Sequence, residues 1–310
     1  MLAFHLRVAV DTTMNKDTFS RCHPIVNMLY FVLVIGCAIM LTHPFFLALS
    51  FICALIYAIY LGGKKTVRFN LLYMLPLLVI TALLNPAFSH QGVTILTYLP
   101  DGNPLTLESI LYGISAAFLL ITVIAWFSCF NKIMTSDKFI YLFGRVIPAL
   151  SLILSMALRF VPRFTAQIKV ISNAQKCVGR DMSTGNPLRR AKHGIKVLSI
   201  LVTWALENAI DTADSMKSRG YGLPGRTAFS IYHFDKHDIK ILVFLLLCGI
   251  AIIAGAISGK LKFIYYPVIS SVNLSITQII LFTIYLALCG TPILLNLMEV
   301  IRWRKIRQSA

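Results

Sequence analysis

The hydropathy pattern of the chain is dominated by six apolar stretches, each close to the roughly 20 residues that cross a bilayer as a helix. Short polar segments separate them, except between the fourth and the fifth, where a long and mostly polar stretch intervenes. The stretches are Ile25–Leu41, Phe45–Leu61, Leu71–Phe88, Ser109–Phe130, Ile239–Ser258 and Leu274–Leu297. This pattern predicts an all-α integral membrane protein with about six transmembrane helices. We expect a membrane region over 1–138, a cytoplasmic helical region over 139–226 and a second membrane region over 227–310.

The composition agrees with a membrane protein. Hydrophobic residues make up 57% of the chain and the mean hydropathy is +0.77, whereas soluble domains are roughly 45–50% apolar. Glu108 lies just before the fourth stretch and Lys240 at the start of the fifth, but the interiors of the six stretches contain no Asp, Glu, Lys or Arg. Ion-driven carriers and intramembrane enzymes hold ionisable groups at membrane depth, so the pattern disfavours both of these classes.

The distribution of basic residues predicts the topology. The net charge is +17, and 14 of the 29 Lys and Arg residues lie between Arg159 and Lys240. If the six spans alternate, 27 of the 29 fall on one side, which the positive-inside rule assigns to the cytoplasm. We therefore expect a multi-pass protein of the cell membrane with both termini cytoplasmic. The basicity then reflects topology, and no nucleic-acid partner is expected.

The segment Phe139–Leu158 has two interpretations. It is apolar enough for a seventh span, but Arg145 and Pro148 interrupt it. A helix on the membrane surface is the favoured alternative, because a true span would break the charge alternation.

Two amphipathic helices are predicted in the central region, separated by a turn at Asp181–Pro187. The second should present one apolar face, formed by Ile195, Leu198, Val202, Ala205, Ala209, Ala213 and Met216. Another face carries an acidic stripe of Glu207, Asp211 and Asp214. Like charges at this spacing repel, so the stripe either faces basic groups of the first helix (Arg159, Arg163 or Lys169) or lies in solvent. The small side chains of Ala205, Ala209 and Ala213 suit a close crossing of the two helices.

The end of the second helix carries a motif. The chain reads ADSMKSRGYGLPGRT from Ala213 to Thr227, which resembles the signature of the transmembrane T component of energy-coupling factor transporters, the EcfT/CbiQ family. Further similar segments are Asn85–His90, Gly92–Thr94, Gly102–Pro104 and Thr106–Glu108, which match the family's extracellular loop, and Arg159–Pro162, which matches the lead-in to its first coupling helix. The resemblance implies that Ser218, Arg219 and Gly220 dock an ATPase, and that Asn85, Pro86, Gly92, Asn103 and Pro104 belong to that loop. Independently, Gly220 suits a helix end and an Arg there suits a partner's carboxylate.

The first predicted coupling helix departs from the family pattern. Its run Ala174-Gln175-Lys176 matches, but Cys177-Val178-Gly179 stands where small-Arg-Gly is expected. Val178 therefore occupies the arginine position. Arg180, flanked by Gly179 and Asp181, either reaches the same partner from a shifted position or the contact is absent.

The resemblance implies a non-enzymatic subunit that holds two ATP-binding-cassette ATPases and a small substrate-binding membrane S component. Such a complex imports a vitamin or a transition-metal ion. One alternative is the substrate-translocating permease of a conventional importer, which would need a polar path through its spans. A membrane-embedded enzyme using Glu207, Asp211 or Asp214 is a second alternative, but these residues lack an accompanying His or metal-ligand pattern.

No cofactor or metal site is expected. No phosphate-binding loop is present, because Gly62-Gly63-Lys64-Lys65-Thr66 lacks the first glycine at the required spacing. The seven cysteines form no CxxC or Cys/His cluster in the sequence. His233 and His237 are four residues apart, but the residues between them indicate an interfacial linker.

Overall fold

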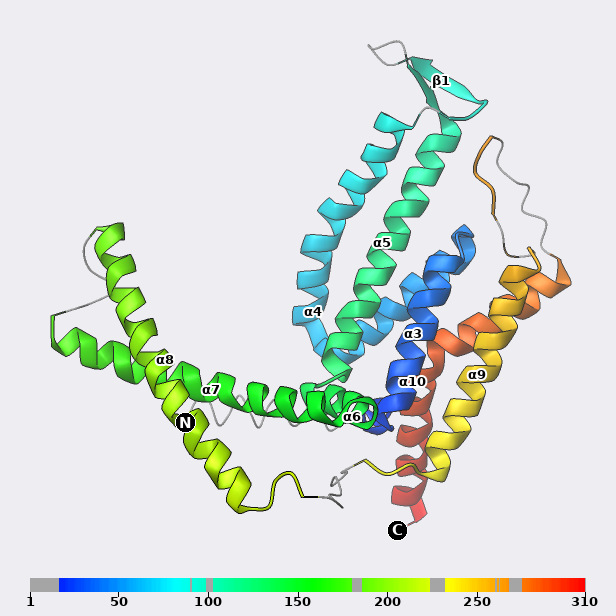
Figure 1. Cartoon of the computed structure of the whole chain (residues 1–310). Coiled ribbons are helices and arrows are strands. Elements are labelled where there is room, and N and C mark those ends of the chain that lie inside the picture. The colour runs from blue at the N-terminus through cyan, green and yellow to red at the C-terminus, as the bar shows by residue number, and fades with distance from the viewer. Residues whose placement is uncertain are drawn as a thin grey trace. The chain divides into compact units, whose positions relative to one another are not determined.

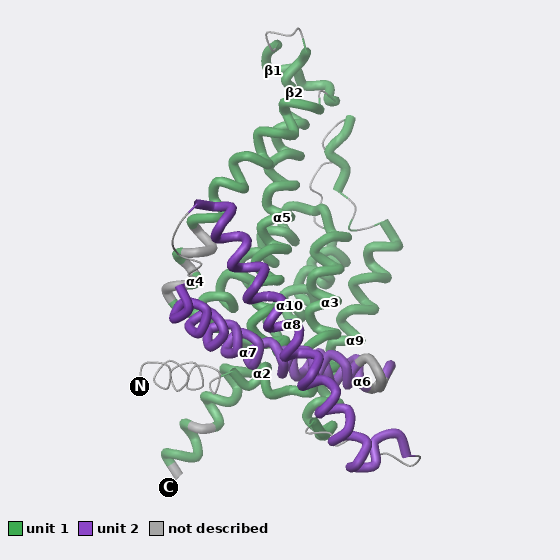
Figure 2. Tube along the Cα trace, turned by 60° about the vertical axis from the view of Figure 1, so that its left-hand side comes forward, with its two compact units in different colours: residues 1–135, 232–310 green, residues 136–231 purple. Residues whose placement is uncertain are grey.

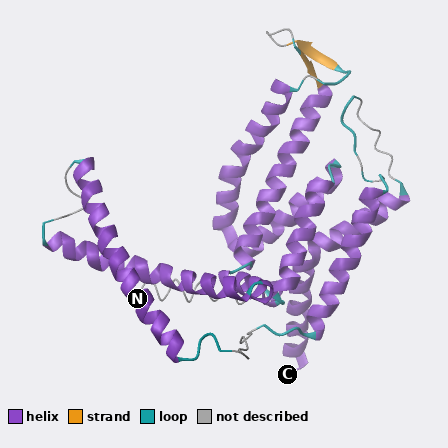
Figure 3. Cartoon of the chain, viewed as in Figure 1, coloured by secondary structure: helices purple, strands orange, loops and turns teal. Residues whose placement is uncertain are grey.

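The computed structural model describes residues 17–89, 91–98, 103–179, 186–223, 232–259, 261, 263–267 and 275–309. Helices dominate these residues, and their only sheet is a two-stranded antiparallel hairpin (Figures 1 and 3). The elements are α2 (Thr18–Arg21), α3 (Pro24–Met40), α4 (Pro44–Phe88), β1 (Ile95–Tyr98), β2 (Pro104–Thr106), α5 (Leu107–Ile133), α6 (Ser136–Val146), α7 (Pro148–Cys177), α8 (Pro187–Ser218), α9 (Lys236–Ile257) and α10 (Ile276–Ser309). The prediction of an all-α membrane protein is confirmed.

The chain divides into two compact units, which Figure 2 colours separately. The first combines Met1–Thr135 with Tyr232–Ala310, so the two predicted membrane regions form one body. The second unit is Ser136–Ile231 and contains α6, α7 and α8. Each unit is described below by itself.

Among its described residues, the first unit holds six apolar helices, one on each predicted stretch. Four are long enough to cross a membrane: Pro44–Gly63, Leu107–Ile133, Lys236–Ile257 and Ile276–Gln308. Pro24–Met40 and Leu72–Phe88 are shorter. Two of the six lie within α4, whose backbone leaves helical geometry at Gly63, with φ 59° and ψ −163°. This break lets one continuous element supply two apolar segments with different directions.

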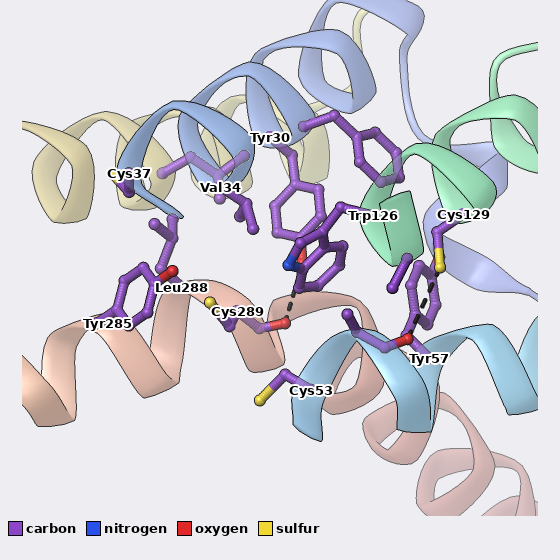
Figure 4. Packing of buried hydrophobic residues seen from close by; sticks show 14 of the residues in the cluster. Tyr30, Val34, Cys37, Cys53, Tyr57, Trp126, Cys129, Tyr285, Leu288 and Cys289 are labelled. Carbon is purple, nitrogen blue, oxygen red and sulfur yellow. Dashed lines mark hydrogen bonds between the residues drawn. The ribbon is translucent and has the colours of Figure 1, made fainter. Parts of the chain in front are cut away.

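The centre of this unit is a cluster of buried aromatic side chains contributed by α3, α4, α5 and α10 (Figure 4). Tyr30 and Trp126 meet edge to face with ring centroids 5.9 Å apart. Both also satisfy their polar atoms, because Tyr30 donates to the carbonyl of Cys289 at 2.9 Å and the Trp126 indole N–H donates to Ser50 at 2.9 Å. The aromatic rings therefore supply contact area and also fix the relative positions of four helices.

A buried polar network ties the first described residues to helices distant in sequence. The Asp17 carboxylate is 3% exposed and accepts hydrogen bonds from Asn296 Nδ2 at 2.7 Å and the Tyr57 hydroxyl at 3.0 Å. The next residue continues the network, because Thr18 donates its N–H to Asn296 Oδ1 at 2.8 Å and its hydroxyl to Glu299. Asp17 and Thr18 thus link α2 to α4 and α10.

In the second unit, the segment Phe139–Leu158 is not the single helix that the sequence suggested. α6 ends at Val146 and α7 begins at Pro148, with Ile147 in an extended conformation between them. Proline fits the first turn of a helix, where its missing N–H costs nothing, so Pro148 starts a helix instead of interrupting one. α7 then continues through Pro162 to Cys177, and the predicted lead-in Arg159–Pro162 lies well inside it.

The Asp17 network generates a stability prediction. Asp17→Ala leaves the Tyr57 hydroxyl and the Asn296 amide without their acceptor in a buried site, and each unsatisfied group costs about 1–3 kcal/mol. We expect a loss of about 2–4 kcal/mol in the free energy of unfolding, measured by denaturant titration of the protein in detergent micelles. Asp211→Ala, which removes an exposed carboxylate on α8, is the control and should change the value by less than about 0.5 kcal/mol. Equal effects of the two variants would contradict the structural role of Asp17.

Candidate functional site

The C-terminus of α8, where the sequence places the docking triplet, is a complete Schellman motif. Ser218 is the last helical residue and Arg219 is the C-cap. Gly220 follows in the left-handed conformation, with φ 78°, and donates its N–H to the carbonyl of Lys217 at 3.0 Å. Tyr221 donates to the carbonyl of Met216 at 3.0 Å. These two bonds satisfy carbonyls that a helix end leaves open, so the helix keeps regular geometry up to its final residue.

The Arg219 side chain is exposed at this rigid end. The Gly220 and Tyr221 N–H groups already satisfy the last carbonyls, and the guanidinium makes no hydrogen bond or ion pair with any residue that the structure describes. It therefore does not act as a cap for its own helix. A guanidinium whose five N–H donors have no partner among the described residues is suited to bind a carboxylate or a set of carbonyls on a partner.

The end of α7 has the same backbone geometry with different chemistry. Val178 is the C-cap, and Gly179 follows with φ 76° and donates to the carbonyl of Lys176 at 3.0 Å. Cys177, Val178 and Gly179 thus correspond to Ser218, Arg219 and Gly220. Val178 is 67% exposed, so an apolar side chain projects where α8 presents a cation. Arg180 and Asp181, the predicted substitutes, lie outside the described residues.

The two long helices of this unit cross through large side chains. Ile171 of α7 packs against Val197 and Leu201 of α8. One to two turns further along α8, Arg163 donates to Asn208 Oδ1 at 2.9 Å, and its guanidinium carbon lies 5.5 Å from the centre of the Trp204 ring. The predicted packing residue Arg163, although exposed, is therefore at the crossing, whereas the exposed Arg159, one turn earlier, has no such contact among the described residues.

The face of α8 that packs on α7 differs from the predicted one. The predicted face is largely exposed: Ile195, Leu198 and Val202 expose between 50% and 68% of their surface, and Ala209 and Ala213 are also exposed. Ala205 is half-buried, at the edge of the contact. The packing face follows Val197, Leu201, Trp204 and Asn208 instead. Both stripes have helical spacing, so periodicity could not choose between them.

The acidic stripe of α8 lies in solvent. Glu207, Asp211 and Asp214 are all exposed, and none forms an ion pair with a basic group among the described residues. Lys169 and Arg159 are exposed as well, and Arg163 is engaged with Asn208 and Trp204 instead. Of the two interpretations that the sequence allowed, the solvated face is the one observed.

The predicted loop residues between α4 and α5 occupy three kinds of structure. Asn85 and Pro86 lie in the last turn of α4 instead of in a loop. Gly92 lies between α4 and β1, and Asn103 precedes Pro104, the first residue of β2. His90, Asp101 and Gly102 lie outside the described residues. The loop therefore contains a small hairpin, which the sequence pattern did not predict.

Buried polar contacts hold this hairpin on the start of α5. The Glu108 carboxylate, 2% exposed, accepts from the Thr94 hydroxyl at 2.7 Å and from the Thr94 N–H at 3.2 Å. The Thr106 side chain accepts the N–H of Ser109 and so caps the helix. Glu108 was the one charged residue at the first four predicted stretches, and this structural contact explains its position.

Comparison with known proteins adds an independent observation. Residues 17–229 match the family model CbiQ, described as cobalt transport protein. Among curated proteins, the chain is similar to the energy-coupling factor transporter transmembrane protein EcfT of Lactobacillus helveticus, with 40% identity over 106 residues, 34% of this chain and 38% of the relative. The proteins of the same name from Leuconostoc gelidum and Lactococcus lactis are 40% and 36% identical over 111 and 105 residues, which are 36% and 34% of this chain and 41% and 40% of theirs. These matches span about two fifths of the length of each relative.

The crossing of α7 and α8 can be tested by hydrogen exchange. Arg163→Ala removes the hydrogen bond to Asn208 and the contact with Trp204, together worth about 1 kcal/mol at an exposed site. Backbone amides of α8 around 197–208 should then exchange about fivefold faster. Arg159→Ala removes the same side chain one turn away from the contact and should leave the exchange rates unchanged. A similar acceleration in both variants would mean that Arg163 does not fix the crossing.

Proposed function

Since the chain belongs to the CbiQ family of cobalt transport proteins, we propose that it is the transmembrane T component of an energy-coupling factor transporter. The relatives that bear this name are energy-coupling factor transporter transmembrane proteins, and the six apolar helices support a location in the membrane. In this role the chain transmits motion between other subunits. It neither hydrolyses ATP nor binds the imported substrate.

The observation that carries the proposal is the exposed Arg219 at the rigid end of α8. In the proposed complex, two ATP-binding-cassette ATPases bind the ends of the coupling helices α7 and α8. The Arg219 guanidinium enters a groove on one ATPase and binds a carboxylate or carbonyl there. A charged pair of this kind, removed from water, contributes about 2–5 kcal/mol to binding. The Schellman motif at Gly220 supports this role because it satisfies the helix end without using the Arg219 side chain.

Length and packing suit α7 and α8 to carry motion over a distance. α7 has 30 residues and α8 has 32, which correspond to about 45 and 48 Å at about 1.5 Å per residue. Their contact is held by the Ile171–Val197–Leu201 cluster and by Arg163. We propose that closure of the ATPases on ATP displaces the two helix ends, and that the crossed pair moves largely as one body.

The exposed apolar stripe of α8 is the proposed contact for the small S component. It consists of Ile195, Leu198, Val202, Leu206 and Ile210, which are each at least half exposed. An apolar stripe opposite the packing face is unfavourable in water unless another surface buries it. A membrane protein with apolar helices could supply that surface. Movement of α8 would then reorient the S component and deliver its substrate, a vitamin or a transition-metal ion.

The topology in this proposal follows the basic residues. The last described helix, α10, ends in the basic group Arg302, Arg304, Lys305 and Arg307, as expected for a cytoplasmic end. We place both termini and the second unit on the cytoplasmic side, where the ATPases have access to ATP.

The decisive experiment is an affinity pull-down of the full chain from detergent-solubilised native membranes, followed by quantitative mass spectrometry. We expect the wild-type protein to recover two ATPase chains and a small apolar membrane protein. Arg219→Glu should lose most of the ATPase while still inserting into the membrane, because the reversed charge repels the partner's carboxylate. Lys217→Glu, the same charge reversal two residues earlier on an exposed position, is the control and should retain the ATPases. Equal ATPase recovery by wild type and Arg219→Glu would refute the docking role.

The end of α7 can be tested separately. If Arg180 substitutes for the arginine that Val178 displaces, Arg180→Glu should reduce ATPase recovery in the same pull-down. The matched control is Arg189→Glu, which reverses an exposed charge in the first turn of α8. Intact assembly in Arg180→Glu would mean that this contact is absent and that α8 alone supplies a docking arginine.

A further inference from the structure

A cluster of potential metal ligands lies in the first unit, which does not include the coupling helices α7 and α8. Cys22 follows α2, and His237 and Asp238 belong to the first turn of α9, more than 200 residues later. The Cys22 Sγ, an imidazole nitrogen of His237 and a carboxylate oxygen of Asp238 all lie within 4.8 Å of one another. His233, which the sequence pairs with His237, does not belong to this group.

We propose that Cys22, His237 and Asp238 bind a divalent transition-metal ion, with Zn²⁺ as the best match. One thiolate, one imidazole and one carboxylate are the ligand types that Zn²⁺ takes, at about 2.0–2.3 Å each. The thiolate and carboxylate together carry two negative charges, which a divalent cation neutralises. Ca²⁺ and Mg²⁺ require mostly oxygen ligands and are disfavoured by the sulfur. Three protein ligands leave a fourth tetrahedral position for water.

The surroundings orient the ligands. Asp238 Oδ1 accepts the N–H of His23 at 3.3 Å, and Asp238 Oδ2 accepts the N–H of Asp235 at 3.3 Å. Backbone donors of this kind fix the carboxylate and leave further lone pairs for a metal. The Cys22 thiol lies 3.7 Å from the carbonyl of Thr18, to which it donates, and loss of its proton on metal binding releases that contact.

Burial gives the site one fixed side and one adjustable side. Cys22 and Asp238 are 5% and 6% exposed, so their positions are set by the fold. His237 is exposed, so its ring can reorient toward an ion held by the two buried ligands. A bound ion would join the segment before α3 to the start of α9. This inference does not rest on the proposed transport function.

The test uses the purified full-length protein in detergent, stripped with a chelator and titrated with Co²⁺. Co²⁺ replaces Zn²⁺ as the probe because Zn²⁺ has a filled d shell and gives no spectrum. We expect a thiolate-to-cobalt charge-transfer band that saturates at one ion per chain and disappears when Zn²⁺ is added. Cys22→Ser should abolish the band, whereas Cys177→Ser, which removes the exposed cysteine, should keep it.

The histidine ligand has a matched pair of variants. His237→Asn should weaken Co²⁺ binding more than about tenfold, whereas His233→Asn should leave it unchanged. Both positions are exposed, so folding is preserved in each. Absence of the band in the wild-type protein, its persistence in Cys22→Ser with the fold intact, or equal affinities of the two histidine variants would overturn the proposal.

Discussion

Lipid removes the usual reason for helices to pack, and the structure of the first unit follows from that constraint. Apolar side chains gain little by leaving hydrocarbon for another helix, so close contact and internal hydrogen bonds must set the helix positions. Only about a third of each long span is buried. Among the polar contacts that fix them are the Trp126 indole on Ser50, the Tyr30 hydroxyl on the Cys289 carbonyl, and the Asp17 carboxylate on α4 and α10. The larger part of each long span is therefore exposed.

The close approach of α4 and α5 shows the same constraint at the backbone. Pro86 has no N–H, so the carbonyl of Ala82 loses its helical partner. Gly113 of α5 lies against that carbonyl, where a Cβ would come within 2.8 Å of the oxygen. A proline in one helix and a glycine in the next thus form a single contact, although 26 intervening residues separate them in sequence. Neither residue is explained by its own helix alone.

Sequence patterns determined the helices better than the contacts between them. Six long apolar runs predict six helices because hydrocarbon admits little else, and a Gly after a basic residue predicts the helix end at Arg219 and Gly220. The prediction of the packing face of α8 was wrong because Val197, Leu201 and Trp204 are spaced as regularly as Ile195, Leu198 and Val202. The hairpin after α4 rests on the Glu108 contact with Thr94, which no local pattern reveals. Cys22 and His237 meet only because the fold brings α2 to α9.

The exposed apolar stripe of α8 affects the stability of a newly made copy of the protein in the cell. A newly made copy without partners carries Ile195, Leu198, Val202, Leu206 and Ile210 uncovered on the face of α8 that does not pack on α7. Such a surface is a substrate for chaperones and for proteases that remove orphan subunits. Under the proposed function, the S component that covers the stripe therefore protects this chain, and overproduction of the chain alone should yield turnover instead of accumulation.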